Sequence, residues 1–373
     1  MTLPERDVIT KGPDRGRRRS MWRPVIVFGL VIAVVVTLVR AQHPGNRGAS
    51  ATSSPSPPAP TARPAATAPP AADTIVARVP LSVAGFDPPG VALGGGAIWV
   101  ADWGARRLLK VSTATNKIVA RRDLGRVYGG ATSIAYGAGS VWIATDPGGT
   151  VLRIDPRTLR TTARVRYGGT FETLLAFGAG RLWVMACCGA DDSTAILTRI
   201  DPRTNRAVQA HMFGGDRGSV LLAGDDGVWT DSPFPKLARR DPHTLAVVQQ
   251  VPGGRSGGPA VLDGGELWTV SGDARLLRID GATGVRVTGP EGSGEGVETI
   301  GAGPDGIFAV TNDGRLLRID ERTLRPLQAG VVVNPPVPQW SRLLSGESEG
   351  LWLATRGELV RLDPDRLPQV SGT

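Results

Sequence analysis

The sequence predicts an all-β fold, a seven-bladed β-propeller that follows an N-terminal transmembrane or signal helix. A unit of about 40 residues recurs seven times between Gly90 and Asp363, and a period of this length indicates a repeated supersecondary unit. Each unit consists of short apolar runs bounded by Gly and Asp, which favours strands of about 4 to 8 residues over helices. The recurrent aromatic position is occupied by Trp99, Trp142, Trp183, Trp229, Trp268, Phe308 and Trp352.

The ring of blades is expected to close through the two ends of the repeat region. Strand edges left unpaired would promote association with other chains, and closure removes them. The first six units end with a strand after a turn, whereas the seventh has only residues 364–373 left. Residues 74–80 precede the first unit and repeat the Ile-Val-Ala-Arg of residues 118–121. We therefore expect residues 74–80 to be the outer strand of the seventh blade; the alternative is a short outer strand over residues 367–370.

The N-terminal region differs in composition from the repeats. An arginine cluster in residues 1–23 precedes an uncharged stretch of sixteen residues, 24–39, that is rich in Val, Ile and Leu. A basic flank before an apolar stretch is typical of an export signal, and the positive-inside rule keeps the flank in the cytoplasm. Sixteen helical residues rise about 24 Å, less than the roughly 30 Å hydrocarbon core. Residues 24–40 are therefore expected to be a transmembrane anchor or a cleaved signal segment, after a basic cytoplasmic tail.

Residues 41–73 are expected to be a disordered linker. They consist mainly of Ala, Pro, Ser and Thr, which bury too little apolar surface to offset the entropy lost on ordering. The propeller then comprises residues 74–373. We expect it to lie on the extracytoplasmic side of the cell membrane, or to be secreted if the signal is cleaved.

The net charge belongs largely to the N-terminal region. The chain carries a formal charge of +9, and residues 1–73 contribute +6 of it through ten Lys or Arg and four Asp or Glu. The propeller therefore carries only +3 and has no basic stripe interleaved with aromatic residues. We expect the membrane to be a partner through the N-terminal helix, and nucleic acid not to be one.

The repeat motif resembles a known class of propellers. Residues 137–158 read Gly-x-Gly-x-Val-Trp-Ile-Ala and then Leu-x-Arg-Ile-Asp-Pro-x-Thr. This pattern resembles the bacterial YVTN-type propellers and, more loosely, NHL-repeat and streptogramin-lyase-like propellers. The resemblance covers nearly all of the predicted propeller and implies the fold, but it indicates little about function because the shared residues build blades. In the repeated turn, Asp accepts backbone hydrogen bonds and Pro presets φ.

Ligand-binding residues are sought where the units differ from one another. In a propeller, the loops between blades and the loops between second and third strands lie on one face around the channel mouth. Charged and aromatic side chains that converge there predict a polar pocket with aromatic walls, the alternative being an ordinary solvated rim. The candidate ligand-binding residues are Asp102, Trp103, Asp146, Glu172, Arg217, Arg255, Glu298, Trp340 and Arg342.

The only two cysteines, Cys187 and Cys188, are adjacent. Outside the cytoplasm they tend to oxidise. Neighbouring cysteines can form only a strained vicinal disulfide, because their Cα atoms lie about 3.8 Å apart, below the usual disulfide range. The alternatives are two free thiols or intermolecular pairing. Neither a metal site nor a cofactor is expected, since no cluster with metal-ligand spacing is present.

The variable face predicts a binding module more strongly than an enzyme. Streptogramin-lyase-like enzymes carry a histidine at the starts of inner strands, and the resemblance fails there because the predicted propeller contains only His211 and His243, which lie elsewhere. We therefore expect a membrane-anchored extracytoplasmic propeller that recognises a protein, a glycan or a small ligand. The alternative is a lyase or hydrolase that uses Glu172 or Glu298 as its base.

Overall fold

The structure is a computed structural model, and its description is confined to part of the chain. The predicted cytoplasmic tail, membrane or signal segment and linker, residues 1–73, lie outside this part. Among the residues described, no helix is long and apolar enough to cross a membrane. The described residues are 74–81, 90–125, 134–145, 149–168, 171–187, 194–214, 220–231, 236–252, 258–303, 305–333, 336–338, 341–346 and 348–370.

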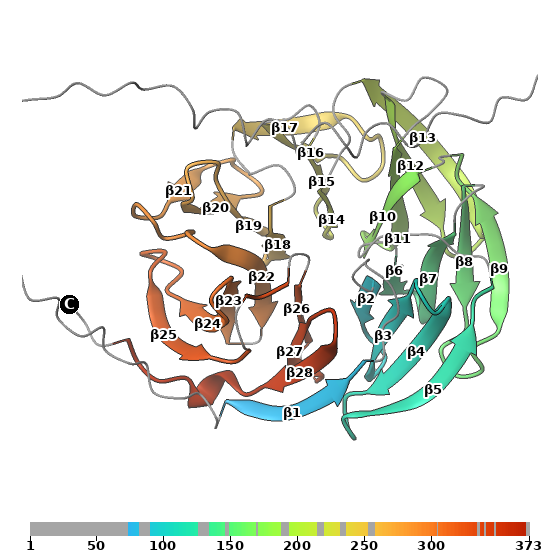
Figure 1. The fold of residues 1–373 in the computed structure, drawn as a ribbon. Helices are drawn as coiled ribbons and strands as arrows, with labels where there is room; N and C mark the ends of the chain where they lie inside the picture. Colours follow the sequence, from blue (N-terminus) through green and yellow to red (C-terminus); the bar gives the residue numbers. More distant parts are fainter. Residues whose placement is uncertain are drawn as a thin grey trace, which may run out of the picture. The chain divides into compact units, whose positions relative to one another are not determined.

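These residues form seven four-stranded antiparallel sheets arranged as the blades of a propeller (Figure 1). Blade 1 comprises β2 (Gly90–Leu93), β3 (Ala97–Asp102), β4 (Arg107–Ser112) and β5 (Lys117–Asp123). Blade 2 comprises β6 (Ile134–Gly137), β7 (Ser140–Thr145), β8 (Thr150–Ile154) and β9 (Thr161–Arg166). Blade 3 comprises β10 (Phe171–Gly178), β11 (Arg181–Cys187), β12 (Thr194–Asp201) and β13 (Arg206–Gly214).

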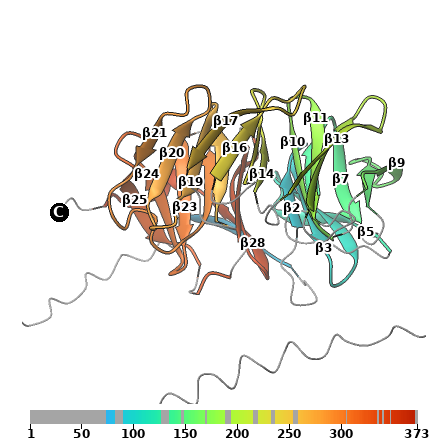
Figure 2. The same ribbon diagram turned by 90° about the horizontal axis from the view of Figure 1, so that it is seen from above.

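The remaining blades repeat this order of strands from the centre outward, and Figure 2 shows the ring from a second direction. Blade 4 comprises β14 (Leu221–Ala223), β15 (Val228–Thr230), β16 (Lys236–Arg240) and β17 (Val247–Pro252). Blade 5 comprises β18 (Ala260–Asp263), β19 (Glu266–Val270), β20 (Leu276–Asp280) and β21 (Arg286–Thr288). Blade 6 comprises β22 (Val297–Gly303), β23 (Gly306–Thr311), β24 (Arg315–Ile319) and β25 (Pro326–Val331). The seven-bladed all-β prediction is confirmed.

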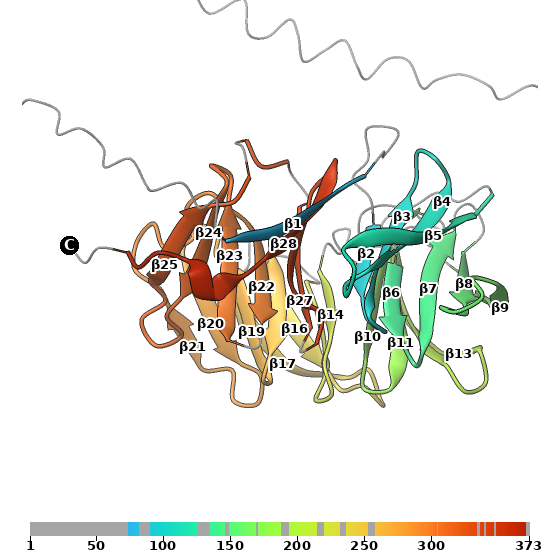
Figure 3. The same cartoon turned by 90° about the horizontal axis from the view of Figure 1, so that it is seen from below.

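The seventh blade combines both ends of the described chain. It comprises β26 (Arg342–Gly346), β27 (Gly350–Ala354), β28 (Glu358–Leu362) and β1 (Ile75–Pro80). β1 runs beside β28 (Figure 3). In the register of this outer pair, Arg78 lies opposite Val360 and Val79 opposite Leu359. The expectation that residues 74–80 complete the seventh blade is therefore confirmed.

The C-terminal residues pair with blade 6 and not with blade 7, where the alternative prediction placed residues 367–370. After a short 3-10 helix, η1 (Pro364–Arg366), the chain runs beside β25 of blade 6. The Ala329 amide donates to the Pro368 carbonyl at 3.0 Å, and the Val370 amide donates to the Leu327 carbonyl at 3.0 Å. The alternative that residues 367–370 form the outer strand of blade 7 is wrong, because β1 already occupies that edge.

The recurrent aromatic residues pack between blades. All seven are fully or almost fully buried, with at most 1% of the surface exposed. Trp99 of blade 1 shares a core cluster with Val141 and Ile143 of blade 2. Trp352 of blade 7 shares one with Ile98 and Val100 of blade 1, which completes the ring. Alternation along the second strand produces this arrangement, since every second residue faces the same neighbouring sheet.

A basic residue on the third strand adds a polar link between some blades. The Arg153 guanidinium lies 5.0 Å from the ring centroid of Trp142, and its Nη1 atom donates to the Pro202 carbonyl of blade 3 at 2.6 Å. Similarly, Arg361 of blade 7 lies over Trp352, and Nη1 donates to the Thr113 carbonyl of blade 1 at 2.9 Å. One side chain thus joins the buried aromatic ring of its own blade to the turn of the next.

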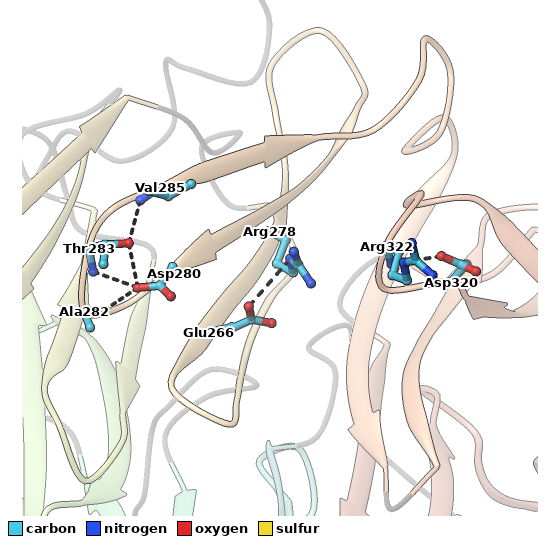
Figure 4. A network of polar contacts seen from close by, with 8 residues as sticks. All are labelled: Glu266, Arg278, Asp280, Ala282, Thr283, Val285, Asp320 and Arg322. Carbon is cyan, nitrogen blue, oxygen red and sulfur yellow. Dashed lines mark hydrogen bonds and ion pairs between the residues drawn. The ribbon is translucent and has the colours of Figure 1, made fainter.

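The repeated turn is held by its aspartate, as the sequence predicts. In blade 5, the Asp280 Oδ1 atom accepts hydrogen bonds from the amides of Ala282 and Thr283 at 2.9 and 2.7 Å (Figure 4). The Thr283 hydroxyl donates to the same oxygen at 2.9 Å. The backbone amide of the threonine is the largest cause that lowers the carboxyl pKa in Asp155, Asp241, Asp280 and Asp320.

Connections between blades and turns between second and third strands lie at the same end of the ring. Backbone hydrogen bonds join the two kinds of segment: the Leu124 amide donates to the Arg106 carbonyl at 2.8 Å, and the Gly294 amide donates to the Ala274 carbonyl at 3.0 Å. The Asp-containing turns join third and fourth strands and therefore lie at the other end. The two faces of the propeller thus differ: one is built from the repeat consensus and the other from variable segments.

We predict that β1 is required for a stable ring. A variant that begins at Thr74 keeps the hydrogen bond from the Asp363 amide to the Thr74 carbonyl and should melt as the full chain does. A variant that begins at residue 82 lacks β1 and exposes the edge of β28, so its melting temperature should fall and its aggregation should rise. Circular dichroism and light scattering measure both effects. Equal melting of the two variants would contradict the role of β1.

We also predict that the aspartate turns make stability pH-dependent. Their pKa values are lowered in the folded chain, so they stabilise it above the ordinary aspartate pKa of about 3.9, and this stabilisation is lost as the pH falls through the folded values. A variant with Asn at all four positions retains an acceptor oxygen and should lose less melting temperature between about pH 6 and pH 3. Glu291→Gln, an exposed carboxyl outside these turns, is the control. An unchanged pH profile in the fourfold variant would refute the prediction.

Candidate functional site

The described inner strands surround a cavity of about 220 Å³ at the centre of the ring. All seven blades contribute to it, and the contributing residues lie mostly in the first half of each inner strand or just before it. In Figure 1 these strands are the innermost of each blade. The lining residues are Val91, Ile134, Leu174, Leu175, Val220, Leu221, Leu222, Gly258, Pro259, Ala260, Val261, Thr299, Ile300, Arg342, Leu343 and Leu344.

Glycines let neighbouring inner strands approach closely near the cavity. A Cβ atom at Gly301 of β22 would lie 2.6 Å from the Leu343 Cβ of β26, and one at Gly178 of β10 would lie 2.3 Å from the Ala223 carbonyl oxygen of β14. Real Cβ contacts are longer than this, so a larger residue would push the strands apart. A hydrogen bond at 3.1 Å from the Leu343 amide to the Thr299 hydroxyl also joins β22 to β26.

Arg342 is the one charged side chain among the described lining residues. It begins β26, at the end of the ring where the variable segments lie. Its Nη1 atom donates to the Ser341 carbonyl at 3.2 Å, and the Ser341 hydroxyl, on a residue only 2% exposed, donates to the Pro338 carbonyl at 2.7 Å. Burial lowers the pKa of the Arg342 guanidinium, which nevertheless stays charged because arginine does not lose its proton in proteins.

Asp102 and Trp103, which were predicted to bind ligand, have other surroundings. Asp102 is fully buried at the end of β3, where Oδ1 accepts from the Ala105 amide and Oδ2 from the Arg107 Nε atom, both at 3.0 Å. Trp103 is 7% exposed and belongs to the core cluster between blades 1 and 2. Neither lines the cavity.

Of the other predicted ligand-binding residues, only Glu298 has a described side chain. Glu298 lies on β22 at a register shift, is partly exposed and does not line the cavity. The side chain of Glu172 lies outside the described residues, although its backbone belongs to β10. Four further predicted residues lie outside the described residues altogether: Asp146, Arg217, Arg255 and Trp340. Arg342 is the single predicted residue that the structure places in the wall.

The vicinal disulfide stays a prediction. Cys187 ends β11, but its side chain lies outside the described residues, as does Cys188. Among the residues that are described, no group of three or more His, Cys, Asp or Glu side chains could hold a metal ion.

The apolar part of the wall escaped the sequence analysis. The predicted site residues are charged or aromatic and lie in variable loops, whereas most of the wall side chains are Val, Leu and Ile at the starts of inner strands. A signal was present in Val220-Leu221-Leu222, an apolar run that leads into the three-residue inner strand β14. On an inner strand, one edge faces the channel instead of another strand, so its backbone groups border the channel together with the flanks of side chains that pack between blades.

The chain resembles solved propellers in fold. The WD40 domain of Neurospora crassa Pan2 has a TM-score of 0.59 at 12% identity, with 76% of this chain and 92% of that domain covered. A chain of the mitotic checkpoint complex has a TM-score of 0.62 at 14% identity, with 85% of this chain and 98% of that chain covered. Identities this low show the fold alone. No protein-family model matches the chain, and no curated protein matches it in sequence.

Proposed function

We propose that this chain is a membrane-anchored extracytoplasmic binding module that recognises its ligand at the variable face of the propeller, with the central cavity as the recognition site. The observation that carries this proposal is the composition of the cavity wall. Apolar side chains from seven separate strands and one arginine meet at the centre. A concave site in which apolar side chains surround a few placed polar groups is the usual form of a small-molecule site.

The repeats support the assignment to YVTN-type propellers, which we propose on the motif alone. The aspartate turn and the buried tryptophan that define the motif both have structural roles here, as the hydrogen bonds of Asp280 and the burial of Trp268 demonstrate. Ligand recognition is left to positions at which the units differ, such as Arg342.

The described part of the cavity wall supports binding, and the side chain of Glu172, one of the two bases named for a lyase or hydrolase, lies outside the described residues. Proton abstraction needs a base within hydrogen-bonding reach of the substrate. Among the described lining residues there is no carboxylate and no imidazole, and the one ionisable group is a guanidinium. An arginine can position or stabilise an anion, but it does not serve as a base because it stays protonated.

The extracytoplasmic location is proposed from the N-terminal sequence. The arginine cluster in residues 1–23 and the apolar stretch from 24 to 39 support insertion with the tail in the cytoplasm. The Pro-rich linker over residues 41–73 would act as a spacer of extended chain between the membrane and the propeller.

We predict that protease added to intact cells or spheroplasts digests the protein from residue 41 onward and spares the first 23 residues, because the membrane shields the tail. Immunodetection of a tag at each end measures the two fragments. A mature N-terminus near Gln42 would identify the cleaved form. Full-length protein in the cytosolic fraction would overturn the proposed location.

We further predict that filling the cavity abolishes binding. Ala260 lines the cavity, so Ala260→Trp should exclude the ligand that is retained when the full chain is purified in mild detergent from its native envelope. Native mass spectrometry measures the retained mass. Val248→Trp, at a position 53% exposed on the outer strand β17, is the matched control and should bind as the unchanged chain does. Equal retention by Ala260→Trp would place the site elsewhere.

A further inference from the structure

We propose that the outer rim of blades 1 and 2 docks on an anionic lipid surface, so that the propeller lies edge-on against the membrane that holds its anchor. This basic rim consists of the outer strands β5 and β9, the turns that lead into them and the groove between the two blades. The proposal rests on the membrane anchor of the proposed function and is independent of the cavity. It follows from the charge around the ring, the arginines in one groove and the point at which the linker joins the ring.

Charge is distributed unevenly around the ring. Residues 90–168, which contain blades 1 and 2, include twelve Lys or Arg and four Asp or Glu, a net charge of +8 counted over every residue of the range. Residues 258–333, which contain blades 5 and 6, include seven Arg and eleven Asp or Glu, a net charge of −4. Blades 5 and 6 lie across the ring from blade 2 (Figure 1). A negatively charged surface therefore attracts one edge of the ring and repels the opposite edge.

Arginines from two blades face one groove on the basic rim. Arg122 of β5 lies opposite Leu108, and Arg164 of β9 lies opposite Leu152. Both leucines belong to the core cluster between blades 1 and 2, and directly opposed residues share a face, so the two arginines continue this seam outward. Arg166, two residues after Arg164 on the same strand, faces the same side. The exposed cationic residues of the basic rim are Lys117, Arg121, Arg157, Arg160, Arg164 and Arg166.

The two seam arginines lie close enough to repel each other. Arg122 reaches across to blade 2, where Nη1 donates to the Leu159 carbonyl and Nη2 donates to the Thr161 hydroxyl at 2.7 Å. Burial is the largest cause that lowers the pKa of the Arg122 guanidinium, and repulsion by Arg164 lowers this pKa further. An anion bound in the groove would offset that repulsion.

Two acids described near the basic rim face other groups. Asp123 follows Arg122 on β5, so its side chain points to the other side of the strand, and it lies opposite Arg107. Asp155 belongs to the turn before β9, where Oδ1 accepts from the Thr158 amide at 2.7 Å. The groove therefore presents its guanidinium groups to an anion from outside the propeller.

The position of the linker favours a lipid surface among anionic partners. Residues 41–73 lead into β1, the outer strand of blade 7, and blade 7 packs against blade 1 through Trp352. The linker thus joins the ring at its outer edge, next to the basic rim. An extended linker of this length reaches roughly 100 Å at most, so it keeps the rim near the lipid headgroups at high effective concentration. Edge-on docking leaves the variable face open to a ligand.

The test measures how closely each edge of the full-length chain approaches a bilayer. The chain is placed in nanodiscs of phosphatidylcholine alone or of an equal mixture with phosphatidylglycerol, with an acceptor dye on the lipid headgroups. A donor dye is attached through p-azidophenylalanine at Val119 of β5, which is 53% exposed, or at Val285 of blade 5, which is 62% exposed and lies across the ring. Energy transfer from each position is then compared.

We expect strong transfer from residue 119 in discs with phosphatidylglycerol and weak transfer from residue 285. Transfer from residue 119 should fall in phosphatidylcholine discs, and also at about 1 M salt, which screens charges beyond roughly 3 Å. Equal transfer from residue 119 in both kinds of disc would overturn the proposal, because the tether alone would then explain the approach. Stronger transfer from residue 285 would overturn it as well.

Two matched pairs of substitutions assign docking to the groove. Arg164→Gln with Arg166→Gln removes two exposed charges from β9, and should lower the ratio of docked to undocked propeller about tenfold or more. Arg322→Gln with Arg325→Gln removes two exposed charges from blade 6 and should not lower this ratio. Thermal melting checks that both variants fold. Equal losses from the two pairs would refute the assignment.

The anchor is tested separately by the elution of the chain with the discs at high salt. An inserted helix is retained when charges are screened, whereas docking of the basic rim is lost. Loss of co-elution in salt would refute the anchor. Transfer that still depends on phosphatidylglycerol at low salt would then support the basic rim on its own.

Discussion

The packing of one aromatic side chain between each pair of blades is the interaction on which the structure depends. Trp99, Trp142 and Trp183 lie against the next blade, not within their own, so each sheet buries its second strand only when a neighbour is present. Seven such contacts can all be satisfied only in a closed ring. The last one joins Trp352 to blade 1, and it explains why β1, the first described strand, belongs to the last blade.

The polar links between blades vary around the ring. Arg153 and Arg361 reach the turn of the next blade, whereas Arg278 of blade 5 pairs with Glu266 of its own blade at 3.6 Å (Figure 4). Trp99 and Trp142 donate their indole N–H groups to glycine carbonyls at 3.1 and 3.0 Å, while the indole nitrogens of Trp229 and Trp268 have no hydrogen-bond partner among the described residues. The apolar contact is thus common to all the blades, and the polar contacts are local additions to it.

Closure of the ring also creates the cavity. Inner strands from seven blades each present one edge to the centre, and their side chains meet only because the last blade joins the first. Arg342 enters this wall from the closing blade itself, with its guanidinium held by the Ser341 carbonyl. The candidate site is therefore a property of the whole ring: a change that opens the seam between β1 and β28 would alter the cavity as well as stability.

The sequence by itself determined the number of blades, the burial of the tryptophans and the partner of β1, because these follow from a local period and from the alternation of side chains along single strands. It also identified Arg342, which departs from the repeat. Only the tertiary structure decided that residues 367–370 pair with β25, that Asp102 is committed to its own turn, and that apolar residues such as Leu175 and Leu221 face one cavity. The pairing of residues 367–370 and the meeting of the inner strands join segments that are distant along the chain, and no local pattern encodes such contacts. The Asp102 contacts are local, but residue type alone does not distinguish an aspartate that holds a turn from one that binds a ligand.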